Sequence, residues 1–281
     1  MIVAKVLDAT STGFCPSINM LGENAGDKPK YLQWQRLQNV SGVRPGDTVV
    51  FVDKKMAEAT DPRYDNVRKI GLLIEPFSLH QDNYTFAWDY RHMFHAIFSH
   101  YRPFVDSGRP FYFYPLGGSH VRLWGYFPKT KLVSILMDTD YATLGDQLRH
   151  EIAQRHMMQV DVLGEPYTDR LSSKVPALRP YRYSIIVERC DKEYYFSDKL
   201  VDCISQGTVP IYWGMASIGD VFNADGIIQF FGPDEIPAIL DRISPQDYLS
   251  RQIAVRQNVS IAHRYLCAED WIAKRYHHLL G

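Results

Sequence analysis

Residues 183–222 are the part of the chain best suited to bind an anionic ligand. A strand-like run ends in the acid Glu188, a polar loop follows, and the sequence YFSDK at residues 195–199 opens a predicted helix. The first turn of a helix carries unpaired N–H groups and a partial positive charge, and both attract phosphate. The pattern fits a phosphate-binding helix N-terminus, but by itself it fits a capped surface helix with an acid and a lysine at least as well.

Four side chains at the start of this predicted helix suit a nucleotide. Lys199, in the first turn, adds a full cation directed at phosphate. Asp198 can accept two hydrogen bonds from a vicinal diol such as a ribose, and Tyr195 can donate its O–H to a phosphate or a sugar. Ser197 and Asp198 are good N-cap residues. Each has a structural alternative: a solvated lysine, a partner of the helix dipole, or core packing for the tyrosine.

The same segment resembles the donor-binding block of the family 10 alpha-1,3/4-fucosyltransferases. That family carries F-x-x-x-F-E-N, then Y-V-T-E-K, then V/I-P-I-Y-W-G. The corresponding text here is VER at residues 187–189, YFSDK at 195–199 and VPIYWG at 209–214. The spacing between these three pieces accommodates the family pattern without gaps.

Weaker matches extend the resemblance, and three positions depart from it. VDVLG at 160–164 is similar to the family's V-D-V-x-G, and IEPFS at 74–78 is similar to its E-S-P-S segment. Arg189 stands where the family has asparagine, and Ser197 with Asp198 replaces Thr-Glu. The N-terminal half matches poorly, so the acceptor is not predicted.

The resemblance implies a GT-B fold of the α/β class: two Rossmann-like domains with a cleft between them, the donor held mainly by the second. It implies GDP-fucose as the donor substrate, a glycan hydroxyl as acceptor and inversion at the anomeric carbon. No cofactor is required, and stimulation by a divalent cation stays open. Such chemistry needs a base for the acceptor proton and cations for the diphosphate leaving group.

The resemblance also assigns roles to residues. Lys199 would bind the diphosphate, Asp198 the ribose hydroxyls, and Tyr195 the phosphate or sugar, with Ser197 beside them. Glu188 would face the cleft, with a structural salt-bridge acid as its alternative. The family places an arginine in the helix before V-D-V-x-G, at the position of Gln147 or Arg149 here. Arg149 is the arginine of the two, so we expect it to bind phosphate; a surface helix arginine is the alternative.

Glu75 is the candidate general base. It follows a predicted strand at 70–74, where a Rossmann-like half presents its functional loop, and Pro76 keeps it extended. An ordinary loop carboxylate is the alternative, and Asp89 is a second candidate for the base.

Two further patterns favour structural interpretations. Asp138 and Asp140 form a D-x-D sequence like the metal motif of other glycosyltransferases, but three-residue matches are common. His92, His95 and His100 lie near helical spacing among aromatic residues, which favours packing over a metal site. No metal ligand is therefore predicted.

Strands and helices alternate along the chain, which indicates parallel sheets covered by helices on both faces. Strands are expected at 2–7, 48–52, 70–74, 111–114, 132–137, 159–163, 183–187, 209–213 and 226–230. Helices are expected at 31–38, 90–98, 145–155, 197–205, 217–222, 236–243 and over most of 244–280, with a loop at 11–30.

Two domains are expected, an acceptor-side domain at 1–122 and a donor-binding domain at 123–281, whose last helix can pack back on the first. Gly117 and Gly118, which lack a G-x-G-x-x-G frame, favour an interdomain hinge near this boundary over a phosphate loop.

Composition narrows the class of protein. The 281 residues are 46% hydrophobic with a formal net charge of −1, which does not suit a nucleic-acid surface. The four cysteines form no C-x-x-C pair, so neither a zinc site nor a disulfide framework is indicated. No apolar leader and no run of about 18 apolar residues occurs, so no transmembrane segment is predicted and a cytoplasmic protein is expected.

Two alternatives to a fucosyltransferase stay open: a transferase that uses another sugar nucleotide, and a non-catalytic sugar-nucleotide-binding protein. The acceptor, the linkage and the oligomeric state are not predicted.

Overall fold

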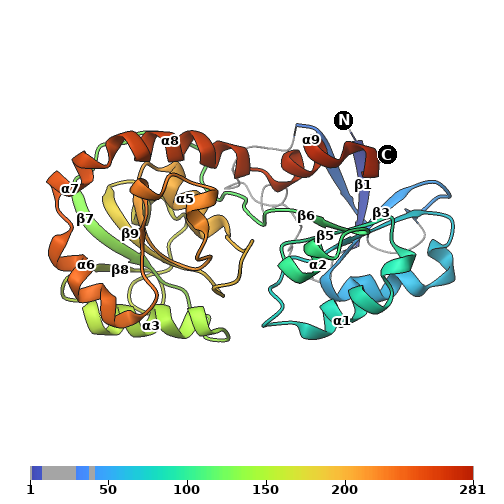
Figure 1. Cartoon of the computed structure of the whole chain (residues 1–281), viewed down its shortest axis with the longest axis horizontal. Coiled ribbons are helices and arrows are strands. Elements are labelled where there is room, and N and C mark those ends of the chain that lie inside the picture. The colour runs from blue at the N-terminus through green and yellow to red at the C-terminus, as the bar shows by residue number, and fades with distance from the viewer. Residues whose placement is uncertain (1, 8–29, 38–41, 281) are drawn as a thin grey trace. The chain divides into compact units, whose positions relative to one another are not determined.

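The computed structural model describes residues 2–7, 30–37 and 42–280 (Figure 1). The chain divides into two compact units, residues 1–118 with 267–281 and residues 119–266. Each unit contains a parallel sheet with helices on both faces. Residues 11–29 of the predicted loop lie outside the described residues.

The first unit has a six-stranded sheet of order β2-β1-β3-β4-β5-β6, in which every pairing is parallel. Its strands are β1 (Ile2–Leu7), β2 (Leu32–Arg36), β3 (Thr48–Val52), β4 (Arg68–Leu72), β5 (Ala96–Ser99) and β6 (Phe111–Phe113). Its helices are η3 (Asp53–Thr60), η4 (Pro62–Tyr64), α1 (Gln81–Asp89), η5 (Arg91–Met93), α2 (Arg102–Asp106) and α9 (Ala268–Leu280).

Both faces of this sheet are buried, which explains why the neighbouring side chains Val49, Val50, Phe51 and Val52 of β3 are all apolar. Val50 of β3 packs in the cluster that contains Ile272 of α9, whereas the next residue, Phe51, packs in the cluster that contains Tyr84 of α1. Successive side chains of a strand point to opposite faces, so α9 and α1 cover opposite faces of the sheet (Figure 1).

Two predicted helices of this unit are wrong. Residues 31–38 contain the strand β2, which extends the sheet by pairing with β1 from Ile2 opposite Leu32 onward. Residues 90–98 split into the short turn η5 and the buried strand β5, which pairs with β4 and β6. In both cases pairing with strands distant in the sequence outweighed an apolar spacing that also fits a helix.

The second unit has a five-stranded parallel sheet of order β11-β10-β9-β7-β8. Its strands are β7 (Lys131–Leu136), β8 (Asp161–Leu163), β9 (Tyr181–Val187), β10 (Val209–Trp213) and β11 (Ile228–Gln229). Its helices are α3 (Leu144–His156), α4 (Val175–Leu178), α5 (Asp198–Ser205), η6 (Ile218–Asp220), η7 (Ala224–Gly226), η8 (Pro233–Glu235), α6 (Ile236–Arg242), α7 (Pro245–Ser250), α8 (Gln252–Ala262) and η9 (His263–Tyr265).

The strand order of the second sheet reverses between β7 and β9. From β7 the chain moves outward to β8, returns to the other side of β7 to form β9, and then continues to β10 and β11. Helix α3, which follows β7, contributes Leu148 and Ile152 to the cluster on one face, and α5, which follows β9, contributes Leu200 and Val201 to the cluster on the other. In open parallel sheets, such a reversal leaves a crevice at the carboxyl ends of the two strands where ligands bind.

The compact units differ from the predicted domains at two places. Residues 119–122 belong to the second unit, and residues 267–281 belong to the first. Helix α9 joins the first sheet because Ile272 and Leu280 pack in its core, and the Thr48 hydroxyl donates a hydrogen bond to the Leu280 carbonyl at 2.8 Å. No helix within the described part of the chain is long and apolar enough to cross a membrane.

Candidate functional site

The loops that follow β7 and β9 are held in direct backbone contact at the reversal of the second sheet. Gly145, in the first turn of α3, lies so close to the end of β9 that an added Cβ would stand 1.7 Å from the Glu188 carbonyl oxygen. The same Cβ would lie 3.1 Å from the carbonyl carbon of Arg189. Only a glycine permits this approach, so Gly145 fixes where the α3 N-terminus lies against the β9 loop.

Glu188 anchors the start of α5 from inside the protein. Its side chain is 0% exposed, and its carboxylate accepts hydrogen bonds from the Ser197 N–H at 2.9 Å and the Ser197 hydroxyl at 2.6 Å. Burial raises the pKa of Glu188, while the charge of Lys199 and the Ser197 hydrogen bonds act in the opposite direction. The resemblance predicts that Glu188 faces the cleft. The structure instead places it where it positions Ser197.

Ser197 caps α5, as the sequence predicted. Its Oγ accepts a hydrogen bond from the Lys199 N–H at 3.2 Å while it donates to Glu188. A serine hydroxyl can do both, because it has one proton and two lone pairs. The end of β9 and the beginning of α5 are thereby joined into one rigid corner.

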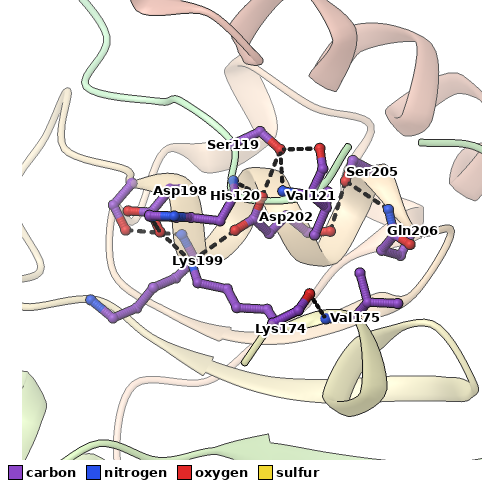
Figure 2. Close-up of polar contacts among 12 residues, drawn as sticks. Ser119, His120, Val121, Lys174, Val175, Asp198, Lys199, Asp202, Ser205 and Gln206 are labelled. Atoms are coloured by element: carbon purple, nitrogen blue, oxygen red, sulfur yellow. Dashed lines mark hydrogen bonds and ion pairs between the residues drawn. The ribbon is translucent and has the colours of Figure 1, made fainter. Parts of the chain in front are cut away.

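Asp198, the first residue of α5, is engaged by two basic side chains (Figure 2). The Lys174 ammonium contacts its carboxylate, and His120 Nε2 lies 3.4 Å from it. Burial alone would raise the pKa of Asp198, but the positive charges of Lys174, His120 and Lys199 outweigh it and hold that pKa below its usual value. Asp198 is therefore an ionised hydrogen-bond acceptor with a fixed orientation.

Asp202, one helical turn further on, connects three segments of the chain. Its fully buried carboxylate accepts hydrogen bonds from Lys174 Nζ at 2.7 Å, the Ser119 hydroxyl at 2.7 Å and the His120 N–H at 2.9 Å (Figure 2). Burial alone would lower the pKa of Lys174, but the carboxylates of Asp198 and Asp202 raise it above its ordinary value. Lys174 thus stays a cation.

Sequence reasoning missed Lys174, His120 and Asp202. One signal was present: Asp198 and Asp202 are four residues apart on a predicted helix, a spacing that puts two carboxylates on one face and calls for a cation between them. Nothing local identified Lys174 as that cation.

Lys199 is partly exposed to solvent, whereas Tyr195 is buried. In Figure 2 the Lys199 side chain points away from the Lys174 ion pairs. Among the residues that the structure describes, no carboxylate forms an ion pair with it. Tyr195 is 2% exposed and lies in the interior. Lys199 is accordingly a cation next to a helix N-terminus, as an anion site requires.

Arg149 and the D-x-D sequence meet at the other side of the reversal. The Arg149 side chain, 5% exposed, uses Nη2 to contact Asp138 and lies 3.4 Å from Asp146 Oδ1. Arg189 Nη2 lies 3.1 Å from Asp140 Oδ2. Within the described ranges, no group of three or more His, Cys, Asp or Glu side chains is arranged to hold a metal ion. Asp138 and Asp140 of the D-x-D sequence thus form ion pairs with Arg149 and Arg189.

The candidate base Glu75 lies at the carboxyl edge of the first sheet. Its N–H donates to Asp53 Oδ1 at 3.4 Å, and its carbonyl accepts from the Tyr84 hydroxyl at 2.7 Å. These bonds fix the backbone and leave the side chain partly exposed. Asp89, the second candidate, is the exposed last residue of α1.

The three histidines singled out in the first unit, His92, His95 and His100, differ in their exposure to solvent. His100 is buried, its Nε2 lies 3.0 Å from the Ile74 carbonyl, and burial lowers its pKa to about 4. His92 and His95 are exposed. His100 is therefore a neutral packing residue beside the Glu75 loop.

Solved structures share this architecture. The crystal structure of an alpha1,3-fucosyltransferase with GDP-fucose aligns with a TM-score of 0.58 and 12% identity, over 99% of this chain and 90% of that one. The crystal structure of an alpha1,3-fucosyltransferase with GDP aligns with a TM-score of 0.56 and 12% identity, over 94% of this chain and 90% of that one. TarM gives 0.60 and 8%, over 86% of this chain and 56% of TarM, and an S. aureus TarM mutant was crystallised with fondaparinux, alpha-GlcNAc-glycerol and UDP.

No protein-family model and no curated protein matches the chain by sequence. At such low identity the structural likeness concerns the fold. The chain has the α/β fold of the GT-B glycosyltransferases, built from two Rossmann-like units with parallel sheets.

Proposed function

We propose that this protein is an inverting glycosyltransferase that moves fucose from GDP-fucose to a glycan hydroxyl. The observation that carries the proposal is the placement of Lys199 at the capped N-terminus of α5, beside the reversal of the second sheet. The resemblance of residues 183–222 to the family 10 donor block and the fold shared with a GDP-fucose-bound fucosyltransferase support the same donor.

The donor side of the mechanism uses charge. Lys199 and the positive end of the α5 dipole bind the diphosphate, and Arg149 adds a second cation across the reversal. Asp198, held ionised by Lys174, accepts hydrogen bonds from the ribose hydroxyls. As the bond to fucose breaks, negative charge grows on the diphosphate, and fixed cations stabilise that charge more than the ground state.

On the acceptor side, Glu75 removes the proton from the attacking hydroxyl. Attack opposite the departing diphosphate inverts the anomeric carbon. We propose that the reaction requires no cofactor, because cations of the protein stabilise the leaving diphosphate. A divalent cation in solution can still increase the rate. We also propose that the chain acts in the cytoplasm.

A second candidate is a transferase that uses a uridine nucleotide, since the TarM mutant with the same fold was crystallised with UDP. Titration calorimetry with GDP-fucose, GDP-mannose and UDP-glucose separates the candidates. Selective binding of GDP-fucose is expected. Tighter binding of UDP-glucose would move the donor to the second candidate, and no binding of any of the three would contradict both.

The role of Lys199 in donor binding can be tested separately. Lys199→Ala is expected to weaken GDP-fucose binding about 10- to 100-fold, the effect of losing one charge-assisted hydrogen bond. Lys131→Ala is the matched control. Lys131 is the first residue of β7, at the amino ends of the strands and away from the proposed site, and its Nζ lies 3.1 Å from Asp161 Oδ2. Equal affinity of wild type and the Lys199 variant would remove Lys199 from the site.

A further inference from the structure

Two arginines at the reversal of the second sheet are each held by an acid from the β7 loop. Arg149 contacts Asp138, and Arg189 contacts Asp140 at 3.1 Å. Both arginines influence one buried carboxyl: burial would raise the pKa of Asp146, but hydrogen bonds from Thr143 and the charges of Arg149 and Arg189 lower it. The four side chains therefore form one charged group across the α3 N-terminus.

The two halves of this group differ in how firmly they are held. Arg149 is 5% exposed and is fixed by the packing of α3, whereas Asp138 and Asp140 are 49% and 54% exposed. Arg149 also keeps an unsatisfied donor, because its buried Nε has no hydrogen-bond partner among the described residues. Buried arginine donors are ordinarily all paired, so the present arrangement leaves Arg149 incompletely satisfied.

A carboxylate and a phosphate offer a guanidinium the same pair of oxygens at the same spacing. The acids lie on the loop directly after β7, at the edge where a ligand of this sheet is expected. Asp138 Oδ1, which contacts Arg149, also accepts a hydrogen bond from the Asp140 N–H at 3.0 Å, so releasing Arg149 costs this bond. The Asp140 carbonyl lies 3.1 Å from His150 Nε2, a contact that remains when the Asp140 side chain turns away from Arg189.

We propose that Asp138 and Asp140 compete with the diphosphate of the donor for Arg149 and Arg189, and that the diphosphate displaces them on binding. The two acids thus weaken anion binding, and Arg189 becomes a second guanidinium contact to the diphosphate. This inference rests on the proposed function for the identity of the donor, but the anion site itself is tested without any nucleotide.

The probe is inorganic pyrophosphate, titrated into the full chain by calorimetry at low salt. Removing a negative charge near the site strengthens anion binding through the Coulomb energy, so Asp140→Asn is expected to bind about threefold tighter and the Asp138→Asn/Asp140→Asn double variant about tenfold tighter than wild type. The gain shrinks in 0.5 M salt because ions screen the half-exposed charges. Asp241→Asn, which removes one acid from the end of α6, is the control and leaves the affinity unchanged.

A double-mutant cycle separates this mechanism from a general change in net charge. In an Arg189→Ala background, Asp140→Asn keeps only the gain from the general change in charge and loses the part that comes from releasing the arginine. Asp138→Asn takes a partner from a buried arginine, so circular dichroism of each variant checks the fold. Asp140→Asn, which alters a half-exposed pair, keeps the test valid should the Asp138 variant unfold.

The outcomes distinguish this inference from the proposed function. Unchanged pyrophosphate affinity in Asp140→Asn, or no pyrophosphate binding in any variant, would overturn the inference even if GDP-fucose binds selectively. Tighter pyrophosphate binding without any GDP-fucose binding would support the anion site and contradict the proposed donor.

Discussion

Lys174 and Asp202 form an ion pair, 2.7 Å from nitrogen to oxygen, in which the carboxylate is completely shielded from solvent (Figure 2). The same ammonium contacts Asp198, so one cation fixes two acids on successive turns of α5. The pair ties the segment before α4 to the helix whose first turn carries the candidate donor-binding residues.

Removing Lys174 should destabilise the protein strongly. Lys174→Met leaves the buried Asp202 without its cation, and breaking a buried pair in this way costs about 3–5 kcal/mol of unfolding free energy. The matched control is Lys192→Met, which breaks an exposed pair with Asp191 and should cost under about 1 kcal/mol. Urea unfolding of both variants measures the difference; equal losses would show that the Lys174 pairs contribute no more than a surface pair.

The pH dependence of stability should carry the signature of Asp198. The pKa of Asp198 in the folded protein lies below the ordinary value of 3.8. The ionised carboxylate therefore makes its full contribution to stability at pH values well above 3.8. This stabilisation is lost as the pH falls through 3.8 toward the folded-state pKa. The difference in unfolding free energy between wild type and Asp198→Asn should therefore shrink between pH 6 and pH 3. A constant difference over this range would argue against an ion pair at Asp198.

The Glu188–Ser197 connection predicts a contrast between two substitutions. Glu188→Ala leaves the Ser197 N–H and hydroxyl without acceptors and should cost about 1–3 kcal/mol. Glu188→Gln keeps an amide oxygen for the N–H and removes a buried charge, so it should cost less. Thermal unfolding ranks the two; equal losses would mean that the charge of Glu188, which both variants lack, holds α5 rather than its hydrogen bonds.

Gly145 should tolerate no side chain. Its Cβ would overlap the Glu188 carbonyl, and backbone atoms cannot move aside as a flexible side chain can. Gly145→Ala is expected to cost at least about 3 kcal/mol or to prevent folding. Gly232→Ala is the control, since no atom lies within 4 Å of its Cβ position. Similar soluble yields and melting temperatures for the two variants would contradict the close approach of α3 and β9.

Glu75→Gln should separate chemistry from donor binding. Loss of the general base should lower kcat about 10²- to 10⁴-fold, while GDP-fucose affinity stays unchanged because the proposed donor contacts lie in the second unit. Asp89→Asn is the companion variant. The rate of fucose transfer to a glycan acceptor and the affinity for GDP-fucose are measured for both variants. A large loss of transfer rate in Asp89→Asn alone would identify Asp89 as the general base.

Local sequence signals predicted much of the second unit. The strand at 209–213 and the cap at Ser197 have the predicted positions, and α3 begins one residue before and ends one residue after its predicted range. These features depend on hydrophobic runs and capping chemistry within a few residues, which a single sequence displays. The predicted helices at 31–38 and 90–98 failed because their true partners are other strands.

The sequence by itself determined the alternation of strands and helices, the acid and the lysine at the start of α5, and the cap at Ser197. Tertiary structure decided which charges meet. Lys174 reaches Asp198 across 24 positions and Ser119 reaches Asp202 across 83, and Asp140 and Arg189 are 49 apart. Ion pairs and burial depend on distance in space, so the partner of each charge, the interior position of Glu188 and the packing of α9 on the first sheet are set by the folded chain.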